Sequence, residues 1–400
     1  MMNGLNFYHF MASLFLAFVS LWHTPFAGAQ TSAQAKDEFE IFAAEMKDSD
    51  GKTKPSSSPS PAPPDAAMVP KAETPPETAD EKIERLKKEI RANPKNTALF
   101  VSLADEFYKK GDNEKVTLLL WKHVDKIDRA GFILLAKAHE KRKESAEMVR
   151  ALNLLLGKNE KDPEALTLMG NALQMQKKTQ DALENYKKAI EINSRYEPAY
   201  NGLIDLYEKR NPPNLYELRI LYQDMTEQIG QRPQYLRRLC EINTLDDTYE
   251  AAITVCKEAL VKDPKTADAH VYLGVAYKAT GDDKKAEATL KKAAHDFPKS
   301  ELAQYHYAKV LEEKKNFVDA MRFFKVGTDA DPQAARSWLG LATTSFEIRK
   351  YDVSLIAYTK ACKLDKKNAA AFRKATTTLR NQRNSQWSEK FENASESCTF

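Results

Sequence analysis

Residues 266–298 read TADAHVYLGVAYKATGDDKKAEATLKKAAHDFP and hold two amphipathic helical patterns that meet at a polar turn. Residues 162–194, DPEALTLMGNALQMQKKTQDALENYKKAIEINS, follow the same plan. Gly170 and Gly274 occupy the same place in the first helical pattern of each stretch, and they lie 104 residues apart, which is three periods of about 34. Repetition at such a period is typical of an array of stacked helical hairpins.

The same period continues in both directions along the chain. Eight units begin near residues 97, 129, 163, 197, 233, 267, 301 and 335. Gly or Ala recurs at three fixed places because two helices approach closely only where side chains are small, and a late proline such as Pro298 ends the second helix. No single hairpin buries its own apolar stripe, so the units must stack. The sequence therefore predicts an all-α solenoid over residues 81–384, with capping helices at 81–92 and 369–383.

Two units depart from this pattern. The second unit has about three extra residues before Ala151. The fourth unit has Asn211, Pro212 and Pro213 at its turn, and its second helix, predicted at 215–229, lacks the small-residue pattern. We expect the pitch of the solenoid to change at this unit.

Composition supports helices and excludes several classes of protein. Only 13 of 400 residues are Gly, whereas a Rossmann enzyme or a large β-sandwich needs more glycine for its turns. The formal net charge of +4 excludes an acidic or basic polymer, and the mean hydropathy of −0.59 excludes a polytopic membrane protein. No phosphate-binding loop, dinucleotide fingerprint or hydrolase motif occurs, and the histidines lack ligand spacing. We therefore expect neither an enzyme nor a bound metal or cofactor.

The repeat resembles the tetratricopeptide repeat (TPR) family. The unit that matches best runs Leu273-Gly274, Tyr277, Gly281, Ala286, Leu290, Ala293 and Pro298, and the resemblance covers about 290 of the 400 residues. It implies a right-handed superhelix of about eight helix-turn-helix repeats whose concave groove is lined by the first helices. It also implies a protein partner in that groove, and no chemistry.

The family register places particular residues in the groove. They are Thr167, Asn171, Gln174, Asn201, Asp205, Arg237, Val271, Lys278, Tyr305, Lys309 and Phe346. Asn171 matches the position at which many family members hold a peptide backbone. Thr167 stands where a carboxylate-clamp member has Lys, so that specialised ligand is not expected. The alternative interpretation of each residue is solvated surface.

Residues 1–29 are interpreted as a secretory signal peptide. They contain no Asp, Glu, Lys or Arg, and an apolar stretch from Phe10 to Trp22 precedes the small-residue pattern Ala27-Gly28-Ala29. About 13 apolar residues are too few for a membrane span. The alternative is an uncleaved membrane anchor, because the segment lacks the Lys or Arg residues that usually precede the apolar stretch of a signal peptide. No cysteine follows, so a lipoprotein is not expected. We predict a periplasmic or secreted protein without a stable membrane span after cleavage.

Residues 30–47 and 48–80 are predicted to form a short amphipathic helix and a Pro-rich disordered linker. Phe39, Phe42 and Met46 recur on one face of residues 33–47, and acidic residues fill the other faces. Such a short stripe cannot form a core alone. One hypothesis is that this tethered helix enters a groove, either its own or a partner's. The other is a spacer with a marginal helix.

The four cysteines fit an oxidising compartment. Cys240 and Cys256 fall at equal height on facing helices of one unit, which allows either a disulfide or two buried thiols. Cys362 and Cys398 could join the predicted tail, 385–400, to the last repeat, or Cys398 could pair with a partner. Nothing in the sequence chooses between these alternatives.

A basic cluster closes the predicted solenoid. It holds Lys360, Lys363, Lys366, Lys367, Arg373, Lys374, Arg380 and Arg383 against Asp365 alone. This cluster could attract an anionic envelope glycan or a lipid surface, or it could simply be a solvated cap. Nucleic acid is not expected as a partner outside the cytoplasm. The main prediction is an exported scaffold that binds an unidentified protein partner and assists assembly of an envelope complex.

Overall fold

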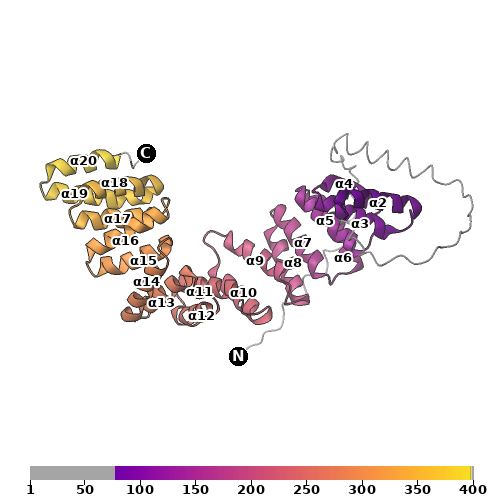
Figure 1. Ribbon diagram of the computed structural model, residues 1–400, viewed down its shortest axis with the longest axis horizontal. Helices are drawn as coiled ribbons and strands as arrows, with labels where there is room; N and C mark the ends of the chain where they lie inside the picture. The colour runs from indigo at the N-terminus through magenta and orange to yellow at the C-terminus, as the bar shows by residue number, and fades with distance from the viewer. Residues whose placement is uncertain (1–76, 397, 399–400) are drawn as a thin grey trace, which may run out of the picture. The chain divides into compact units, whose positions relative to one another are not determined.

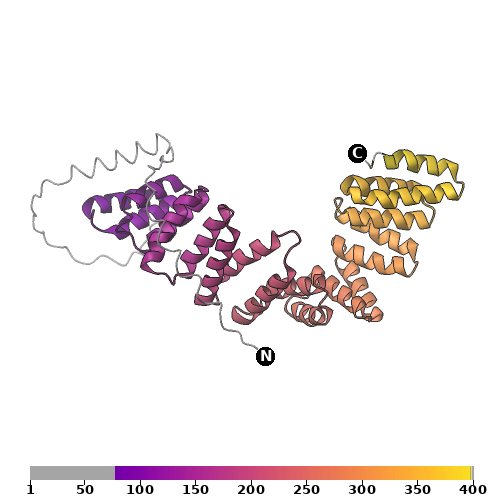
Figure 2. The same ribbon diagram turned by 180° about the vertical axis from the view of Figure 1, so that it is seen from behind.

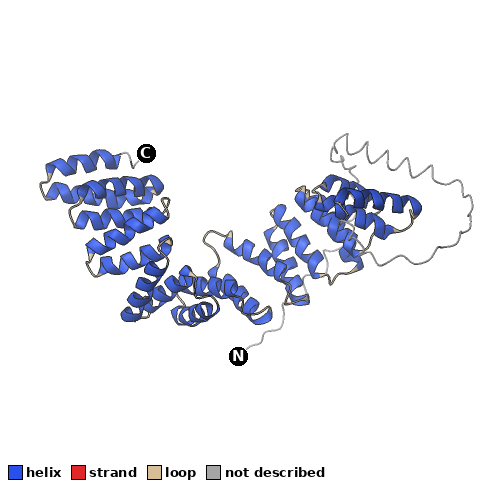
Figure 3. Cartoon of the chain, in the orientation of Figure 1, coloured by secondary structure: helices blue, strands red, loops and turns tan. Residues whose placement is uncertain are grey.

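The computed structural model describes residues 77–396 and residue 398, and these are built from helices joined by short turns (Figure 3). No strand occurs in these residues, so the all-α prediction is confirmed. The helices are α2 (Ala79–Ala92), α3 (Thr97–Lys109), α4 (Asn113–Lys122), α5 (Arg129–Lys141), α6 (Ser145–Lys158), α7 (Pro163–Met175), α8 (Thr179–Ile192), α9 (Glu197–Glu208), α10 (Leu215–Gln228), α11 (Pro233–Leu245), α12 (Tyr249–Lys262), α13 (Ala267–Ala279), α14 (Asp283–Asp296), α15 (Glu301–Glu313), α16 (Phe317–Ala330), α17 (Ala335–Glu347), α18 (Tyr351–Leu364), η1 (Lys366–Asn368, a 3-10 turn), α19 (Ala369–Asn381) and α20 (Ser385–Glu396).

The described chain divides into two compact units. The first holds α2 to α5 and ends at Glu144, and the second holds α6 to α20 and begins at Ser145. In the second unit, successive helices pack as hairpins, and α15 to α18 lie side by side in sequence order (Figures 1 and 2). The first helices of the hairpins start at the residues that the sequence period predicts, from Pro163 in α7 to Ala335 in α17.

Glycines let the helices of the second unit approach closely. The ring of Tyr186, in α8, is fully buried between Gly170 of α7 and Gly202 of α9. A Cβ atom added at either glycine would overlap this ring. The same arrangement recurs where Gly340 of α17 meets the ring of Phe324. The fixed small residues of the repeat are therefore explained by aromatic side chains that fill the space beside them.

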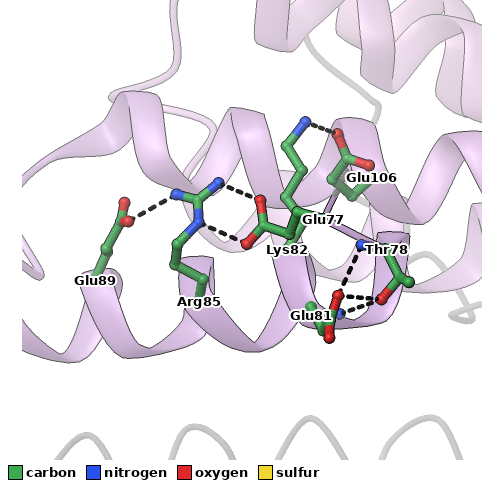
Figure 4. Close-up of polar contacts among 7 residues, drawn as sticks. All are labelled: Glu77, Thr78, Glu81, Lys82, Arg85, Glu89 and Glu106. Carbon is green, nitrogen blue, oxygen red and sulfur yellow. Dashed lines mark hydrogen bonds and ion pairs between the residues drawn. The ribbon is translucent and has the colours of Figure 1, made fainter. Parts of the chain in front are cut away.

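The first unit begins with a helix that is capped by its own side chains (Figure 4). The Thr78 hydroxyl accepts a hydrogen bond from the Glu81 backbone N–H, and the Glu81 carboxylate accepts one from the Thr78 backbone N–H at 2.8 Å. Lys82 forms an ion pair with Glu106 of α3 at 2.5 Å, which joins the two helices. The capping box starts α2 at Ala79, two residues before the predicted start of the capping helix at residue 81.

The fourth hairpin differs from the others at its turn and in the size of the side chains that its second helix buries. The turn between α9 and α10 contains a cis peptide bond between Asn211 and Pro212. On α10, large side chains are buried in place of small ones: Leu218, Leu221, Tyr222 and Met225. The interface of this hairpin is therefore built from bulky residues.

The end of the chain corrects the sequence analysis. Residues 385–396, predicted as part of a tail, form α20, and α19 with α20 makes one further hairpin. Trp387 and Phe391 lie one turn apart on α20, and Phe391 is fully buried between Tyr358 of α18 and Phe372 of α19, with ring centroids 6.3 and 5.8 Å away. These aromatic side chains supply the packing that the small-residue pattern supplies elsewhere, so the predicted solenoid boundary at residue 384 is too early.

Two disulfides lie in the second unit. Cys240 of α11 bonds to Cys256 of α12, with Cα atoms 4.8 Å apart, and Cys362 of α18 bonds to Cys398, just beyond α20. The second bond joins the last hairpin covalently to the hairpin before it.

Several predictions lie outside the described residues. The signal peptide, the tethered helix with Phe39, Phe42 and Met46, and most of the linker fall within residues 1–76. Across the described part of the chain, none of the helices combines the length and the apolar character that crossing a bilayer requires.

Candidate partner-binding face

The exposed sides of α7, α9, α11, α13, α15 and α17 carry most of the residues predicted to meet a partner. We call this surface the first-helix face. The structure brings its predicted residues together in two groups, a polar network on α7 to α9 and a pocket on α13 to α15.

The polar network joins three consecutive helices. The Tyr186 hydroxyl, from α8, donates a hydrogen bond to Asn171 Oδ1 at 2.7 Å or to Gln174 Oε1 at 3.1 Å. The Gln174 amide donates to the Asp205 carboxylate, which also pairs with Lys209 at 2.6 Å. Asn201 is exposed beside this network. These interactions hold Asn171 and Gln174 in one orientation before any partner arrives.

The pocket lies between α13 and α15 and has a volume of about 300 Å³. Val275, Tyr305 and Val310 give it apolar walls, and Lys278 and Lys309 stand at its rim. The remaining lining residues are Ala279, Leu290, His306 and Glu313. This volume is at the lower limit of small-molecule sites, so the pocket suits a side chain or two of a bound peptide better than a cofactor.

Two neighbouring side chains, those of Arg336 and His306, contact the Tyr305 ring at the pocket. The Arg336 guanidinium stacks on its ring at 4.8 Å from the centroid, and the His306 ring meets it edge-on at 5.2 Å. Arg336 is fixed in turn by Glu301, whose Oε1 accepts a hydrogen bond from Arg336 Nε at 3.0 Å. The ring is therefore a preorganised aromatic contact, and such contacts dominate protein recognition.

The charges around the pocket are arranged in opposite pairs. Lys278 pairs with Glu313, and Lys309 pairs with Glu312 at 2.5 Å. Burial lowers the pKa of His306 to about 4, and the charge of Arg336 adds to this effect. His306 is thus neutral at ordinary pH, so the pocket presents an apolar centre and a rim of balanced charge.

Three predicted groove residues are placed differently from the prediction. Thr167 is buried, and its hydroxyl donates to the Pro163 carbonyl oxygen at 2.8 Å. Val271 is fully buried in the core shared with α14 and α15. Phe346 packs against Tyr351 and Phe391, with ring centroids 5.4 and 6.0 Å away. Thr167 and Val271 cannot meet a partner, because neighbouring side chains cover them.

Arg237 lies on the exposed side of α11, where it forms an ion pair with Asp268 at 3.5 Å. It is distant in sequence from both groups and adds a charged contact to the first-helix face between them. The described residues contain no cluster of His, Cys, Asp and Glu that could hold a metal ion.

Sequence reasoning missed His306, Val310 and Glu313 as pocket residues. His306 and Val310 follow the predicted groove residues Tyr305 and Lys309 by one position, which turns them about 100° around α15 toward the preceding hairpin. The register gave the side of the helix that faces outward, whereas the pocket forms where this side meets the neighbouring first helix. A search for apolar residues one position beyond the groove positions would have found Val310.

Most of the basic cluster is exposed in the structure. Of its eight cations, Arg380 forms an ion pair with Glu392 of α20 at 2.5 Å. Lys363, Lys366, Lys367, Arg373, Lys374 and Arg383 are exposed and Lys360 is half-buried. We call these eight residues the basic end.

Family models described as tetratricopeptide repeat match three stretches of the chain. They cover residues 163–196, 245–309 and 284–335. The matched stretches include the polar network's α7 and the whole of the pocket. No curated protein matches the sequence.

Solved structures similar to this chain include other repeat proteins of the same description. A tetratricopeptide repeat protein from Parabacteroides merdae is 16% identical, with a TM-score of 0.44 over 58% of this chain and 92% of that one. The C-terminal part of a TPR repeat-containing protein from Cytophaga hutchinsonii is 16% identical, with a TM-score of 0.48 over 60% of this chain and 99% of that one. YrrB, described as a TPR protein with an unusual peptide-binding site, is 18% identical, with a TM-score of 0.28 over 54% and 93%.

Proposed function

Because this chain is a tetratricopeptide repeat protein, we propose that it is an exported scaffold that binds a protein partner across its first-helix face and assists assembly of a complex in the cell envelope. The general part of this function follows from the family, whose repeats serve protein interaction. That the chain is exported, and that its partner belongs to a complex of the cell envelope, are our proposals.

The pocket on α13 and α15 is the observation that supports a specific site. It offers an aromatic ring fixed by Arg336 and His306, apolar walls, and Lys–Glu pairs at its rim. A peptide that inserts an apolar side chain beside Tyr305 and exchanges polar contacts with the rim fits this surface. The site is rigid, because its side chains are already paired in the free protein.

Site-specific photocrosslinking in intact cells tests the site. A photoreactive amino acid replaces Lys278 at the pocket rim, and a matched variant carries it at Lys291, an exposed residue of the second helix α14. We expect a defined protein to crosslink from position 278 and not from position 291. Equal products from both positions, or none from position 278, would contradict the proposed site.

The captured protein is then purified and its affinity measured. Tyr305→Ala should weaken binding roughly tenfold or more, as loss of a central aromatic contact does. Lys309→Glu reverses the charge of one residue at the pocket rim without removing core packing. It therefore tests the site independently if Tyr305→Ala unfolds. Thr167→Ser, a change at a buried position, serves as the control and should leave the affinity unchanged.

The export part of the proposal rests on residues 1–29 and on the cysteines. An uncharged apolar leader precedes a small-residue cleavage pattern, and the four cysteines form two disulfides, as oxidising compartments permit. We expect cell fractionation to place the protein outside the cytoplasm and N-terminal sequencing to start at Gln30. A cytoplasmic chain that retains residues 1–29 would refute export and leave the partner site intact.

A further inference from the structure

The basic end gathers eight cations and one carboxylate, that of Asp365, within residues 360–383, which gives this segment a net charge of 8 − 1 = +7. On the first-helix face, Lys278 pairs with Glu313, Lys309 with Glu312, and Arg336 with Glu301. Among the described residues, no carboxylate lies within ion-pairing distance of six cations at the basic end: Lys360, Lys363, Lys366, Lys367, Arg373 and Lys374. Ion pairs with the described residues therefore compensate little of the positive charge of this segment.

The acidic residues nearest in sequence are already used by the fold. The Asp365 carboxylate accepts a hydrogen bond from the Lys367 backbone N–H at 3.0 Å, where it caps η1. The Glu392 carboxylate pairs with Arg380. These contacts leave most of the remaining cations exposed to solvent and available to an anionic ligand.

One cation of the basic end occupies a position where glycine would be conformationally easier. Arg383 has a φ of 57°, and Gly111 and Gly281 fill the equivalent turns of other hairpins with φ of 82° and 83°. A left-handed backbone is costly for a residue with a side chain and free of that cost for glycine. Lys315 and Arg349 occupy the same turn position in the two preceding hairpins.

The cations follow the length of one helix. Lys366 and Lys367 lie on η1, Arg373, Lys374 and Arg380 lie on α19, and Arg383 lies just beyond it. Because α19 has 13 residues and rises about 1.5 Å per residue, the charges extend over about 20 Å or more. The ligand that matches them is long and narrow and carries repeated negative charge.

The side chains between the cations indicate which polyanion fits. No large apolar side chain is exposed among residues 366–383, so this surface has nothing to insert into a bilayer. It also offers no exposed aromatic ring on which the bases of a single-stranded nucleic acid could stack, since Phe372 is fully buried. Arginine guanidinium groups match carboxylates and phosphates in a two-bond geometry, so the comparison with phosphate-bearing probes below decides between these two groups. We propose that the basic end binds a linear glycan that bears carboxylate groups, laid along α19.

Titration with a defined glycan tests this proposal. The probe is polygalacturonate, and the protein is the mature full chain. The test variant carries Lys366→Gln, Lys367→Gln, Arg373→Gln and Lys374→Gln, all exposed. The matched control carries Lys187→Gln, Lys188→Gln, Lys284→Gln and Lys291→Gln on α8 and α14, which are exposed as well and change the net charge equally.

We expect the test variant to bind the glycan about tenfold more weakly and the control to bind within about twofold of the wild type. Raising the salt concentration should weaken wild-type binding more steeply than binding by the test variant, because fewer ions are displaced from the variant. The midpoint of urea unfolding should stay the same in both variants.

Equal losses in the test and control variants would overturn the proposal, since binding would then reflect net charge and not α19. It would also be overturned if wild-type protein bound phosphatidylglycerol vesicles or duplex DNA as tightly as the glycan, or if it showed no saturable glycan binding at low salt. None of these results bears on the pocket, because the substituted residues lie outside the first-helix face.

Discussion

Some glycines of this solenoid lie where a neighbouring side chain leaves no room for a Cβ atom, and others do not. Gly170 and Gly202 both lie so close to the Tyr186 ring that neither position has room for a Cβ atom. In contrast, Gly157 of α6 has nothing within 4 Å of the place where a Cβ atom would stand. Replacing glycine by alanine should therefore lower the free energy of unfolding at Gly202 and leave it unchanged or raise it at Gly157.

Gly202→Ala is expected to destabilise the protein by about 1–3 kcal/mol, because the added methyl group overlaps the trapped ring. Gly157→Ala should be neutral or stabilising by up to about 1 kcal/mol, through higher helix propensity. Urea unfolding followed by circular dichroism measures both. A Gly202→Ala variant as stable as the wild type would show that the ring is not confined.

Lys315 holds a left-handed turn with φ of 60°. Lys315→Gly removes the steric cost of that backbone but adds entropy to the unfolded chain, so we expect a net gain in stability of about 0.5–1 kcal/mol. The reverse change in an equivalent turn, Gly281→Lys, should lower stability by a similar amount. The two free energies of unfolding, measured together, check the sign.

His306 should make stability depend on pH. Burial lowers its pKa to about 4 in the folded protein, against 6.5 for the ordinary group, so the unfolded chain binds the extra proton between these values. Its contribution is fully present above pH 6.5 and is lost as pH falls toward 4. Because the side chain is partly exposed, we expect the wild type to lose only about 1–2 kcal/mol more than His306→Gln between pH 7 and pH 4.

The difference between the two proteins isolates this residue, because other groups titrate equally in both. Parallel pH profiles for the wild type and His306→Gln would show that His306 is ordinarily solvated.

Among the elements, α20 depends on tertiary contacts more than on its own sequence. Its anchors are Phe391, buried against α18 and α19, and Trp387, whose ring centroid lies 5.8 Å from that of Tyr351. The disulfide from Cys362 to Cys398 closes a loop with a sequence separation of 36. Cross-linking of this length stabilises the folded state mainly by restricting the unfolded chain.

Removing this cross-link should loosen the last hairpin alone. In the double variant Cys362→Ala, Cys398→Ala, backbone amides of α19 and α20 should exchange faster. The free energy of opening that protects them should fall by up to about 3–4 kcal/mol. Exchange in α13 and α15 should not change, because no contact of the pocket involves this bond. Faster exchange at the pocket would show that the cap controls the whole second unit.

Over the whole second unit, each hairpin is stabilised by its contacts with the hairpins next to it in sequence. Each hairpin packs on the hairpins beside it in sequence, so the free energy is close to a sum of hairpin and interface contributions. Damage in one hairpin should therefore stay near it.

Mass-spectrometric hydrogen exchange of Gly202→Ala measures this locality. Protection should fall in α7 to α10, which surround Tyr186, and stay at the wild-type level in α17 to α20. A uniform loss along residues 145–396 would mean that the unit unfolds as one cooperative block, and the additive description would fail.

The 34-residue period of small and large residues predicts the helical class and the starts of the first helices, because it leaves one way to stack. The resemblance to the tetratricopeptide repeat family, and not the period alone, places Tyr305, Lys278 and Lys309 on the outer side of their helices. The folded chain was needed to show that Thr167 and Val271 are covered and that His306 lines a pocket. It was also needed to show that Lys278, Lys309 and Arg336 form ion pairs, whereas most cations of the basic end do not. The physical reason is that a repeat fixes direction around one helix axis, whereas burial and ion pairing depend on which side chains a neighbouring helix brings within reach. The last hairpin shows the same limit, because the packing role of Trp387 and Phe391 depends on the aromatic rings of α18 and α19 that they contact.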